Sequence, residues 1–434
     1  MSASPRSIIE RNVQDAAKRI SLDLDQPDAE QELRRLIKDE IERWQHDHRR
    51  GVRTVAISSP SQVAERTFDD IARYGPLTRL LDDDDVWEIM VNNPSSIFVK
   101  RHHGPSGYHD DGFIDDDHVT RTLTRLLDNS SGSHRKLDIA EGLQDAQLDS
   151  GARLHIVHGD IARGGHLMVN IRKFTGVSFT RLYELVNRAM LTPHAARFLT
   201  ACVQGRQSIV FAGVPGSGKT TLLNCCAAEL DPTLRVVIAE EVFEADLPIP
   251  NVASMQTRSA RPDRPGVDLR RLVAGFLRMA PDVAIVGEVR DREALPLLLT
   301  LSSGVKGFTT IHAGTARQAL TRLRFICQLS DTASDIPLSA LNTLVTEAID
   351  VVVHTDRGPN GPEVMSILCV EDMAGGTDAV QFTVTEVFHR ARHGEPIAWT
   401  GQLPIRLLAA CERRGVDVRA IFANSPAQQP ATTT

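Results

Sequence analysis

The chain has 434 residues, enough for roughly two to four domains of about 150 residues each. Its 41% hydrophobic and 24% charged residues are typical of a soluble globular protein and exclude collagen-like, rod-like and wholly disordered chains. A net charge of −7 provides no general attraction to nucleic acid or to an anionic membrane. No apolar stretch approaches the about 18 to 20 residues that span a bilayer, and no signal core begins the chain.

The first part of the chain is predicted to be a helical region over residues 1–55. Apolar residues recur at a spacing of three to four from Ile8 to Trp44, with charged residues between them. The polar residues around Pro60 are typical of a linker. Short alternating runs follow, with one helical pattern among them, and predict a mixed α/β domain over residues 62–172.

A second domain is predicted over residues 193–424, after a linker over 173–192 and before a disordered tail over 425–434. Apolar runs at 209–212, 236–239 and 283–286 alternate with helical patterns. This alternation indicates a parallel, doubly wound α/β sheet. The six cysteines lack CxxC spacing, so they predict neither a disulfide framework nor a zinc site and favour a reducing cytoplasm. Cys225 and Cys226 are interpreted as core residues.

The segment from Gly213 to Thr220 has the glycine, lysine and threonine spacing of a phosphate-binding loop. It follows an apolar strand and precedes a helix, which is the context that such a loop needs. Glycines let backbone N–H groups surround the phosphates of ATP, the lysine reaches the β and γ phosphates, and the threonine hydroxyl binds Mg²⁺. The predicted nucleotide-binding residues are Gly213, Pro215, Gly216, Ser217, Gly218, Lys219, Thr220 and Thr221.

Acidic residues end two of the predicted strands. Glu288 follows the run Val283–Val286 and is predicted to be the general base or the residue that orients the attacking water. The alternative is a solvated acid at a helix start, since Asp291 and Glu293 follow it.

A second acidic group follows the strand over 236–239. Glu240, Glu241 and Glu244 are predicted to hold magnesium together with Thr220, directly or through water, with ordinary surface acids as the alternative. His312 closes the strand over 308–311 and is a candidate catalytic residue, with a structural role as the alternative.

These motifs resemble the type II/type IV secretion and pilus ATPases in order and spacing. The resemblance rests on the loop 213–220, the acidic block 240–244, the segment 278–290 and Thr310-Ile-His312-Ala313. Segments at 74–81, 88–92, 148–153 and 170–174 resemble the N-terminal domain of the CpaF-type branch, which drives tight-adherence pili.

The resemblance implies a RecA-like P-loop domain, a PAS-like N-terminal domain and a homo-hexameric ring. The ring would be cytoplasmic and peripherally associated with the cell membrane through an inner-membrane platform protein. The resemblance also implies a nucleotide contact by Arg153 and Arg172 of the N-terminal domain, an "Asp box" at 240–244, a Walker B acid at Glu288 and a "His box" that includes His312.

Three positions depart from the family pattern. Val305 replaces the first His-box histidine, Ala280 replaces a common arginine, and Glu241 stands where aspartate is usual. The first hypothesis is an ATP-hydrolysing motor for pilus assembly or protein secretion. The alternatives are a conjugative DNA-transfer ATPase, although the acidic balance disfavours direct nucleic-acid binding, and a nucleotide-gated subunit that does not hydrolyse ATP.

Acidic runs at 82–85 and 110–117 are interpreted as solvated turns, with His109 and His118 at the flanks of the second run. A divalent-metal site at this run is the alternative.

Overall fold

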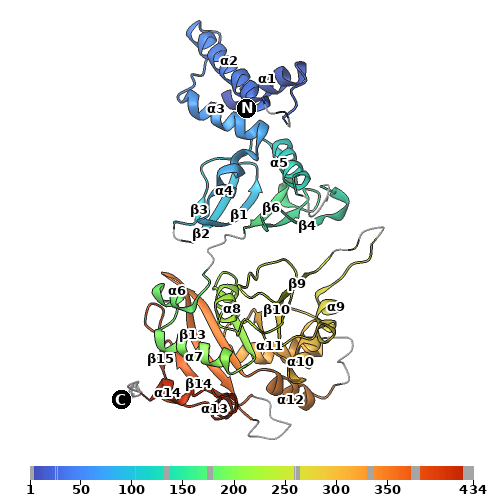
Figure 1. Cartoon of the computed structure of the whole chain (residues 1–434). Helices are drawn as coiled ribbons and strands as arrows, with labels where there is room; N and C mark the ends of the chain where they lie inside the picture. The colour runs from blue at the N-terminus through green and yellow to red at the C-terminus, as the bar shows by residue number, and fades with distance from the viewer. Residues whose placement is uncertain are drawn as a thin grey trace. The chain divides into compact units, whose positions relative to one another are not determined.

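The computed structural model describes residues 4–24, 26, 28–102, 104–130, 137–173, 179–258, 260, 264–329, 336–372 and 382–423. The tail predicted over 425–434 lies outside these residues. The chain divides into two compact units, residues 1–176 and 177–434 (Figure 1). Each unit has a sheet and its own hydrophobic core.

Unit 1 begins with three helices that pack on one another. They are α1 (Pro5–Arg19), α2 (Ala29–Arg49) and α3 (Pro60–Ala72). The Ser4 side chain caps α1 by accepting from the Ser7 backbone, and Pro60 begins α3 rather than lying in a linker. The helical cluster therefore extends past residue 55, where the sequence pattern had ended it. Its buried apolar side chains are Ile9, Val13, Leu33, Ile37, Ile41, Trp44, Phe68 and Ile71.

The second part of unit 1 is an antiparallel sheet in the order β3-β2-β1-β6-β5-β4. Its strands are β1 (Val86–Asn93), β2 (Ser96–Arg101), β3 (Gly107–Tyr108), β4 (Leu143–Gln147), β5 (Arg153–Val157) and β6 (Met168–Arg172). One face packs against α4 (Thr78–Asp82) and α5 (Asp116–Asp128). Short helical turns η1 (Gly75–Leu77), η2 (Ile139–Glu141) and η3 (Arg163–Gly165) complete this part.

Unit 2 is built on a nine-stranded sheet in the order β15-β14-β13-β12-β7-β11-β10-β8-β9. The strands from β12 to β9 pair in parallel, and β13, β14 and β15 extend the sheet antiparallel. The strands are β7 (Ile209–Gly213), β8 (Val236–Glu240), β9 (Val252–Gln256), β10 (Val283–Val289), β11 (Lys306–Ile311), β12 (Val351–Gly358), β13 (Gly361–Val370), β14 (Val384–His389) and β15 (Ala398–Trp399). The predicted parallel α/β sheet is confirmed.

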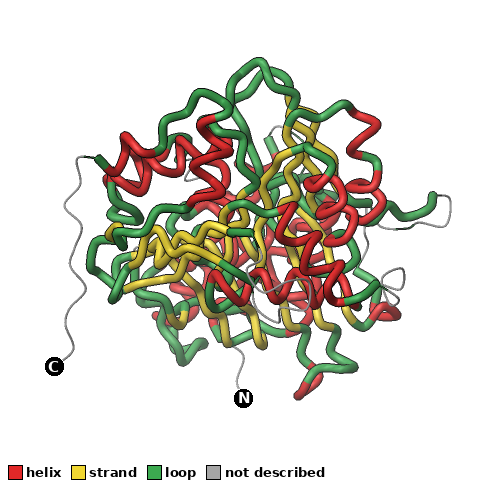
Figure 2. Tube along the Cα trace, turned by 90° about the horizontal axis from the view of Figure 1, so that it is seen from below, coloured by secondary structure: helices red, strands yellow, loops and turns green. Residues whose placement is uncertain are grey.

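Helices cover both faces of this sheet (Figures 1 and 2). One apolar layer includes residues of α6 (Leu182–Asn187), α7 (Pro193–Gln204), α8 (Lys219–Ala227), α13 (Ile405–Glu412) and α14 (Arg419–Phe422). The other includes residues of α9 (Leu269–Ala274), η4 (Phe276–Met279), α10 (Ala294–Ser302), α11 (Ala316–Gln328) and α12 (Leu338–Ala348). Helix α6 lies within the stretch that the sequence pattern assigned to a linker.

All six cysteines are buried as free thiols. Cys225 and Cys226 lie in the layer that includes α8, as predicted. Within the described residues, every helix is too short or too polar to cross a bilayer.

Candidate functional site

The phosphate-loop segment connects β7 to α8 at the carboxyl edge of the parallel strands. Gly216 and Gly218 have φ values of 74° and 83°, a conformation that favours glycine. A Cβ on Gly213 would collide with the carbonyl oxygen of Thr355 on β12. Pro215 is exposed at the loop tip, and Thr221 is half-buried in the first turn of α8. The glycines thus keep open a backbone cradle of the kind that binds phosphate.

Lys219 is the first residue of α8, and its side chain turns back over the loop. The Nζ atom donates to the carbonyl oxygen of Val214 at 2.9 Å and lies 3.3 Å from Nδ1 of His312. Lys219 is 7% exposed. A buried ammonium group with such partners is held ready for a phosphate oxygen.

His312, directly after β11, lies between Lys219 and Glu288. Its Nε2 atom lies 2.7 Å from Oε1 of Glu288. Burial acts to raise the pKa of Glu288, but hydrogen bonds from His312 and Arg290 outweigh burial and lower this pKa to about 2. Glu288 is therefore an anion at neutral pH and can accept a proton or orient a water molecule.

A local irregularity of β10 directs Glu288 toward this site. The register between β10 and β11 shifts between Val286 and Val289, so Gly287 and Glu288 leave the regular ladder. The Thr310 hydroxyl donates to the Gly287 carbonyl at 2.7 Å and fixes the irregular backbone. Because Glu288 lies within this strand segment and is mostly buried, the alternative of a solvated acid at a helix start is wrong for it.

Arg290 joins the two groups of acids. One guanidinium nitrogen lies 2.6 Å from Oε2 of Glu288, and another lies 2.9 Å from Oε2 of Glu241. Strands β8 and β10 are parallel neighbours, which brings their following residues together. Arg290 belongs to a motif quoted from the sequence, but its bridging role was not predicted.

Two other acids, at and after the end of β8, take positions different from that of Glu241. Glu240 is 2% exposed, and its Oε1 atom accepts from the backbone N–H groups of Glu244 and Ala245. Glu244 lies close to Thr220, with 3.4 Å between the hydroxyl oxygen and Oε2. A hydroxyl and a carboxylate are ligands that Mg²⁺ prefers, so these residues fit a magnesium ion beside the loop.

Two further residues contact the loop from β12. The Thr355 hydroxyl lies 2.9 Å from the Ser217 hydroxyl and 3.2 Å from the carbonyl oxygen of Ala212. Arg357 donates to the carbonyl oxygen of Gly216 at 3.4 Å. Sequence reasoning missed both, and the available signal was their place at the end of the apolar strand run 351–353.

Arg153 and Arg172 belong to the sheet of unit 1. They are directly opposite each other on β5 and β6, and Glu88 of β1 is opposite Arg172 on the other side. Their nucleotide contact stays a prediction.

The family departures Val305 and Ala280 lie at the opposite edge of the sheet from Glu288 and His312. Val305 precedes β11, and Ala280 precedes β10, whereas the site residues lie toward the carboxyl ends of these strands. Val305 packs against the apolar layer of α10 and α11. Neither change therefore alters the phosphate-loop chemistry directly.

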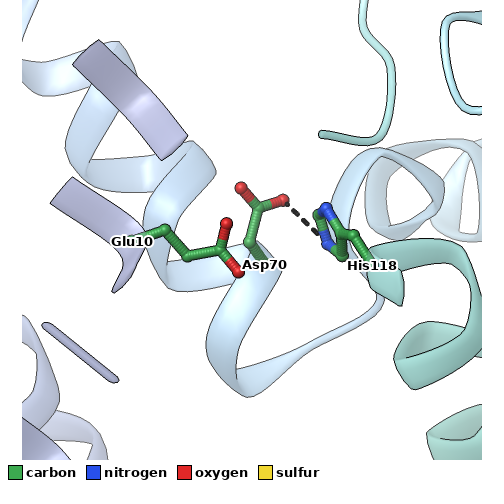
Figure 3. A group of neighbouring side chains, drawn as sticks. All are labelled: Glu10, Asp70 and His118. Atoms are coloured by element: carbon green, nitrogen blue, oxygen red, sulfur yellow. Dashed lines mark ion pairs between the residues drawn. The ribbon is translucent and has the colours of Figure 1, made fainter. Parts of the chain in front are cut away.

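A second cluster of titratable groups lies in unit 1 (Figure 3). Glu10 of α1, Asp70 of α3 and His118 of α5 have ligand atoms within 4.8 Å of one another, and all three are buried. The prediction that the acidic run flanked by His118 is a solvated turn is wrong at His118, which lies inside α5.

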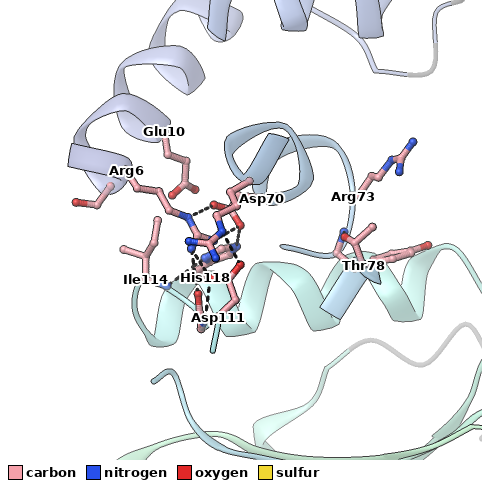
Figure 4. Close-up of polar contacts among 12 residues, drawn as sticks. Arg6, Glu10, Asp70, Arg73, Thr78, Asp111, Ile114 and His118 are labelled. Carbon is pink, nitrogen blue, oxygen red and sulfur yellow. Dashed lines mark hydrogen bonds and ion pairs between the residues drawn. The ribbon is translucent and has the colours of Figure 1, made fainter. Parts of the chain in front are cut away.

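The partners of this cluster test whether it suits a cation (Figure 4). Arg6 holds both oxygens of Asp70 at 2.7 and 2.8 Å and also contacts Asp111 at 2.8 Å. The Nδ1 atom of His118 accepts from the Ile114 backbone at 3.3 Å, which assigns the ring proton to Nε2, the atom facing Asp70. That nitrogen then has no lone pair for a metal. The cluster is an internal ion-pair network that joins α1, α3 and α5.

Comparison with known proteins gives consistent matches. A family model described as "Type II/IV secretion system protein" matches residues 70–354. The conjugal transfer protein TrbB of Rhizobium radiobacter is 32% identical over 306 residues, which cover 67% of this chain and 85% of that protein. A type IV secretion system protein PtlH homolog of Bordetella bronchiseptica is 31% identical over 325 residues, covering 69% and 93%.

Solved structures also match. The VirB11 ATPase from the type IV secretion system of Brucella suis, in complex with sulphate, is 26% identical, covers 67% of this chain and 91% of that chain, and has a TM-score of 0.36. Because the family model spans well over half of the sequence and includes the phosphate loop, Glu288 and His312, this chain belongs to the type II/IV secretion system protein family.

Proposed function

We propose that the chain is an ATP-hydrolysing motor of a secretion or pilus-assembly system. The observation that carries the proposal is the continuous contact Lys219–His312–Glu288 beside the phosphate loop. It brings a cation for the phosphates and an anion for the attacking water to the same edge of the sheet.

In this proposal the loop backbone and Lys219 bind the phosphates of ATP, and Glu288 orients the water that attacks the γ-phosphate. Thr220 and Glu244 would hold Mg²⁺, which neutralises charge on the phosphates when bound. Glu240 orders the acidic loop through its backbone contacts. Products are ADP and phosphate.

The assembly belongs to the proposal as well. The family resemblance favours a homo-hexamer on the cytoplasmic face of the membrane, docked on a platform protein, with Arg153 and Arg172 reaching a nucleotide from the N-terminal domain. An arginine supplied across a boundary stabilises transition-state charge and would join domain closure to hydrolysis. The tight-adherence branch is the specific system that the upstream segments favour.

The test is Mg-ATP turnover per subunit as protein concentration rises, with mass followed by light scattering. We expect specific activity to climb as a ring-sized species appears, and Glu288→Gln to abolish it. Glu412→Gln is the matched control, because Glu412 is exposed on α13 and should leave turnover unchanged. Equal turnover in wild type and Glu288→Gln would reject the assignment of Glu288 and favour the nucleotide-gated alternative.

A conjugative DNA-transfer role is the second candidate, favoured by the similarity to the conjugal transfer protein TrbB. Turnover measured with and without duplex DNA at moderate salt separates direct DNA translocation from a motor that acts on protein partners. We expect no stimulation, given the net charge of −7. Neighbouring relaxase genes would support the conjugative system, and prepilin genes would support a pilus.

A further inference from the structure

Glu241 and Glu288 are held by one guanidinium group. The two terminal nitrogens of Arg290 each take one carboxylate, at 2.9 Å for Glu241 and 2.6 Å for Glu288. A planar guanidinium fixes the direction of both hydrogen bonds, whereas an ammonium group would act as a point charge. The position of Glu241 therefore restricts where the Glu288 carboxylate can lie.

The backbone from which Arg290 extends is itself fixed. A single oxygen of Glu293, Oε1, accepts from the backbone N–H groups of Arg290 and Asp291. Glu293 is 5% exposed at the start of α10. With the backbone held in this way, the remaining freedom of Arg290 is rotation of its side chain. One end of the guanidinium group contacts Glu288, and Glu241 holds the other end.

Both oxygens of Glu288 then have a partner. His312 contacts Oε1 at 2.7 Å, and Arg290 contacts Oε2. Oε1 is buried, whereas the Glu288 side chain as a whole is 21% exposed, so a water molecule would donate to the second lone pair of Oε2. The two contacts remove rotation of the carboxylate without closing it to water.

The structure supports Mg²⁺ binding by Glu241 less well than Mg²⁺ binding by Glu244. Glu244 lies beside the Thr220 hydroxyl, where a P-loop places its magnesium ion, and Glu241 contacts Arg290 instead. If Glu241 also bound Mg²⁺, its carboxylate would hold Arg290 and a divalent ion side by side, and these two positive charges repel each other. The family's usual aspartate is one methylene shorter, and the longer arm of glutamate reaches Arg290.

We infer that Glu241 is a positioning residue that holds Glu288 in its water-orienting pose through Arg290, and is not a magnesium ligand. This inference rests on the proposed ATPase function. The contact is half-exposed, with side-chain exposures of 42% for Arg290 and 45% for Glu241, so it adds little to stability. Variants should fold normally and report on catalysis.

The experiment measures kcat, KM for ATP and the Mg²⁺ concentration for half-maximal turnover. We expect Glu241→Ala to lower kcat about tenfold while KM and the Mg²⁺ requirement stay within twofold of wild type. Glu241→Gln keeps a hydrogen-bond acceptor and should recover most of the loss. Glu244→Ala is the matched control and should raise the Mg²⁺ requirement.

A double-variant comparison completes the test. If Glu241 acts through Arg290, Glu241→Ala in an Arg290→Ala background should lower kcat no further. An increased Mg²⁺ requirement in Glu241→Ala, with activity restored by excess Mg²⁺, would overturn the inference and make Glu241 a metal ligand. Additive losses in the double variant would also overturn it. A wild-type chain without turnover would instead reject the proposed function, and the inference with it.

Discussion

Lys219 and Glu288 contact opposite nitrogens of one imidazole ring, that of His312. Lys219 Nζ lies 3.3 Å from Nδ1, and Glu288 Oε1 lies 2.7 Å from Nε2. The positions of Lys219, which would bind the phosphates, and Glu288, which would orient the water, are therefore coupled through His312. A movement of Lys219 toward a bound phosphate would remove one partner of the ring that orients Glu288.

His312→Ala should lower kcat by on the order of 10²-fold and change KM for ATP much less, because the ring acts on the carboxylate that orients the water. Steady-state turnover at saturating Mg-ATP measures the effect. His389→Ala is the control, since the His389 side chain is half-exposed on β14 and, among the described hydrogen bonds and ion pairs, contacts only Glu386. A kcat within twofold of wild type would leave His312 with a structural role.

Thr355→Val should weaken nucleotide binding about tenfold. The change keeps the shape of the side chain but removes the hydroxyl that joins Ser217 to the Ala212 carbonyl, a contribution of roughly 1 kcal/mol per hydrogen bond. Titration with a fluorescent ATP analogue gives the Kd. An unchanged Kd would mean that the loop keeps its conformation without β12. Thr343→Val on α12 is the matched control, because its hydroxyl bonds only within its own helix.

Arg6→Met should destabilise unit 1 by about 3–5 kcal/mol. It would leave the Asp70 carboxylate, which is fully buried, without its cation. Adding Asp70→Leu should restore much of the loss, because an apolar pair avoids the cost of burying two charges. Urea unfolding followed by tryptophan fluorescence compares the variants. If the double variant unfolds as easily as Arg6→Met, the cost does not arise from the unpaired carboxylate.

Stability of unit 1 should fall as the pH drops from 6.5 toward 5. Burial is the largest cause that lowers the pKa of His118, to about 3, so the unfolded chain takes up a proton near its ordinary pKa of 6.5 while the folded chain does not. The stabilisation is complete above pH 6.5 and is lost by on the order of 2 kcal/mol at pH 5.

His118→Gln should remove this part of the pH dependence, whatever its effect on stability at pH 7. Asp70 acts in the opposite direction because burial raises its pKa, so the variant is compared with wild type at each pH. Urea unfolding at pH 7, 6 and 5 supplies the comparison. Parallel pH profiles of wild type and variant would show that His118 is not the titrating group.

Those parts of the site that neighbouring residues in the sequence identify could be predicted. The loop 213–220 and Glu288 each end an apolar strand run, so strand, turn and chemistry appear together in the sequence. The contact between Ser217 and Thr355 was not predictable, because register between β7 and β12 brings together residues far apart in the chain. The same is true of Arg290 and Glu241, since side-chain reach decides that contact.

In the fold, too, elements with a strong local sequence pattern were predictable and those without one were not. Long apolar runs gave the parallel sheet of unit 2, while the two-residue strand β3 was too short to leave a pattern. Helix α3 was not predicted, because Pro60 and its serine neighbours resemble a linker and instead begin a helix. The cluster of Arg6, Asp70 and His118 comes from three helices, and ionisable residues in a sequence are ordinarily interpreted as solvated.

Strand β11 carries His312 after one end and Val305 before the other. Six residues of strand span about 20 Å, more than twice the roughly 8 Å over which exposed charges are felt at physiological salt. At this separation a charge at position 305 would act only weakly on ATP, so we expect the influence of this residue to be mainly mechanical, through displacement of the strand. Substitutions can therefore alter the transmission of force without altering the chemistry of hydrolysis. A variant at position 305 would change the mechanical work obtained from each ATP molecule while the rate of ATP hydrolysis stays the same.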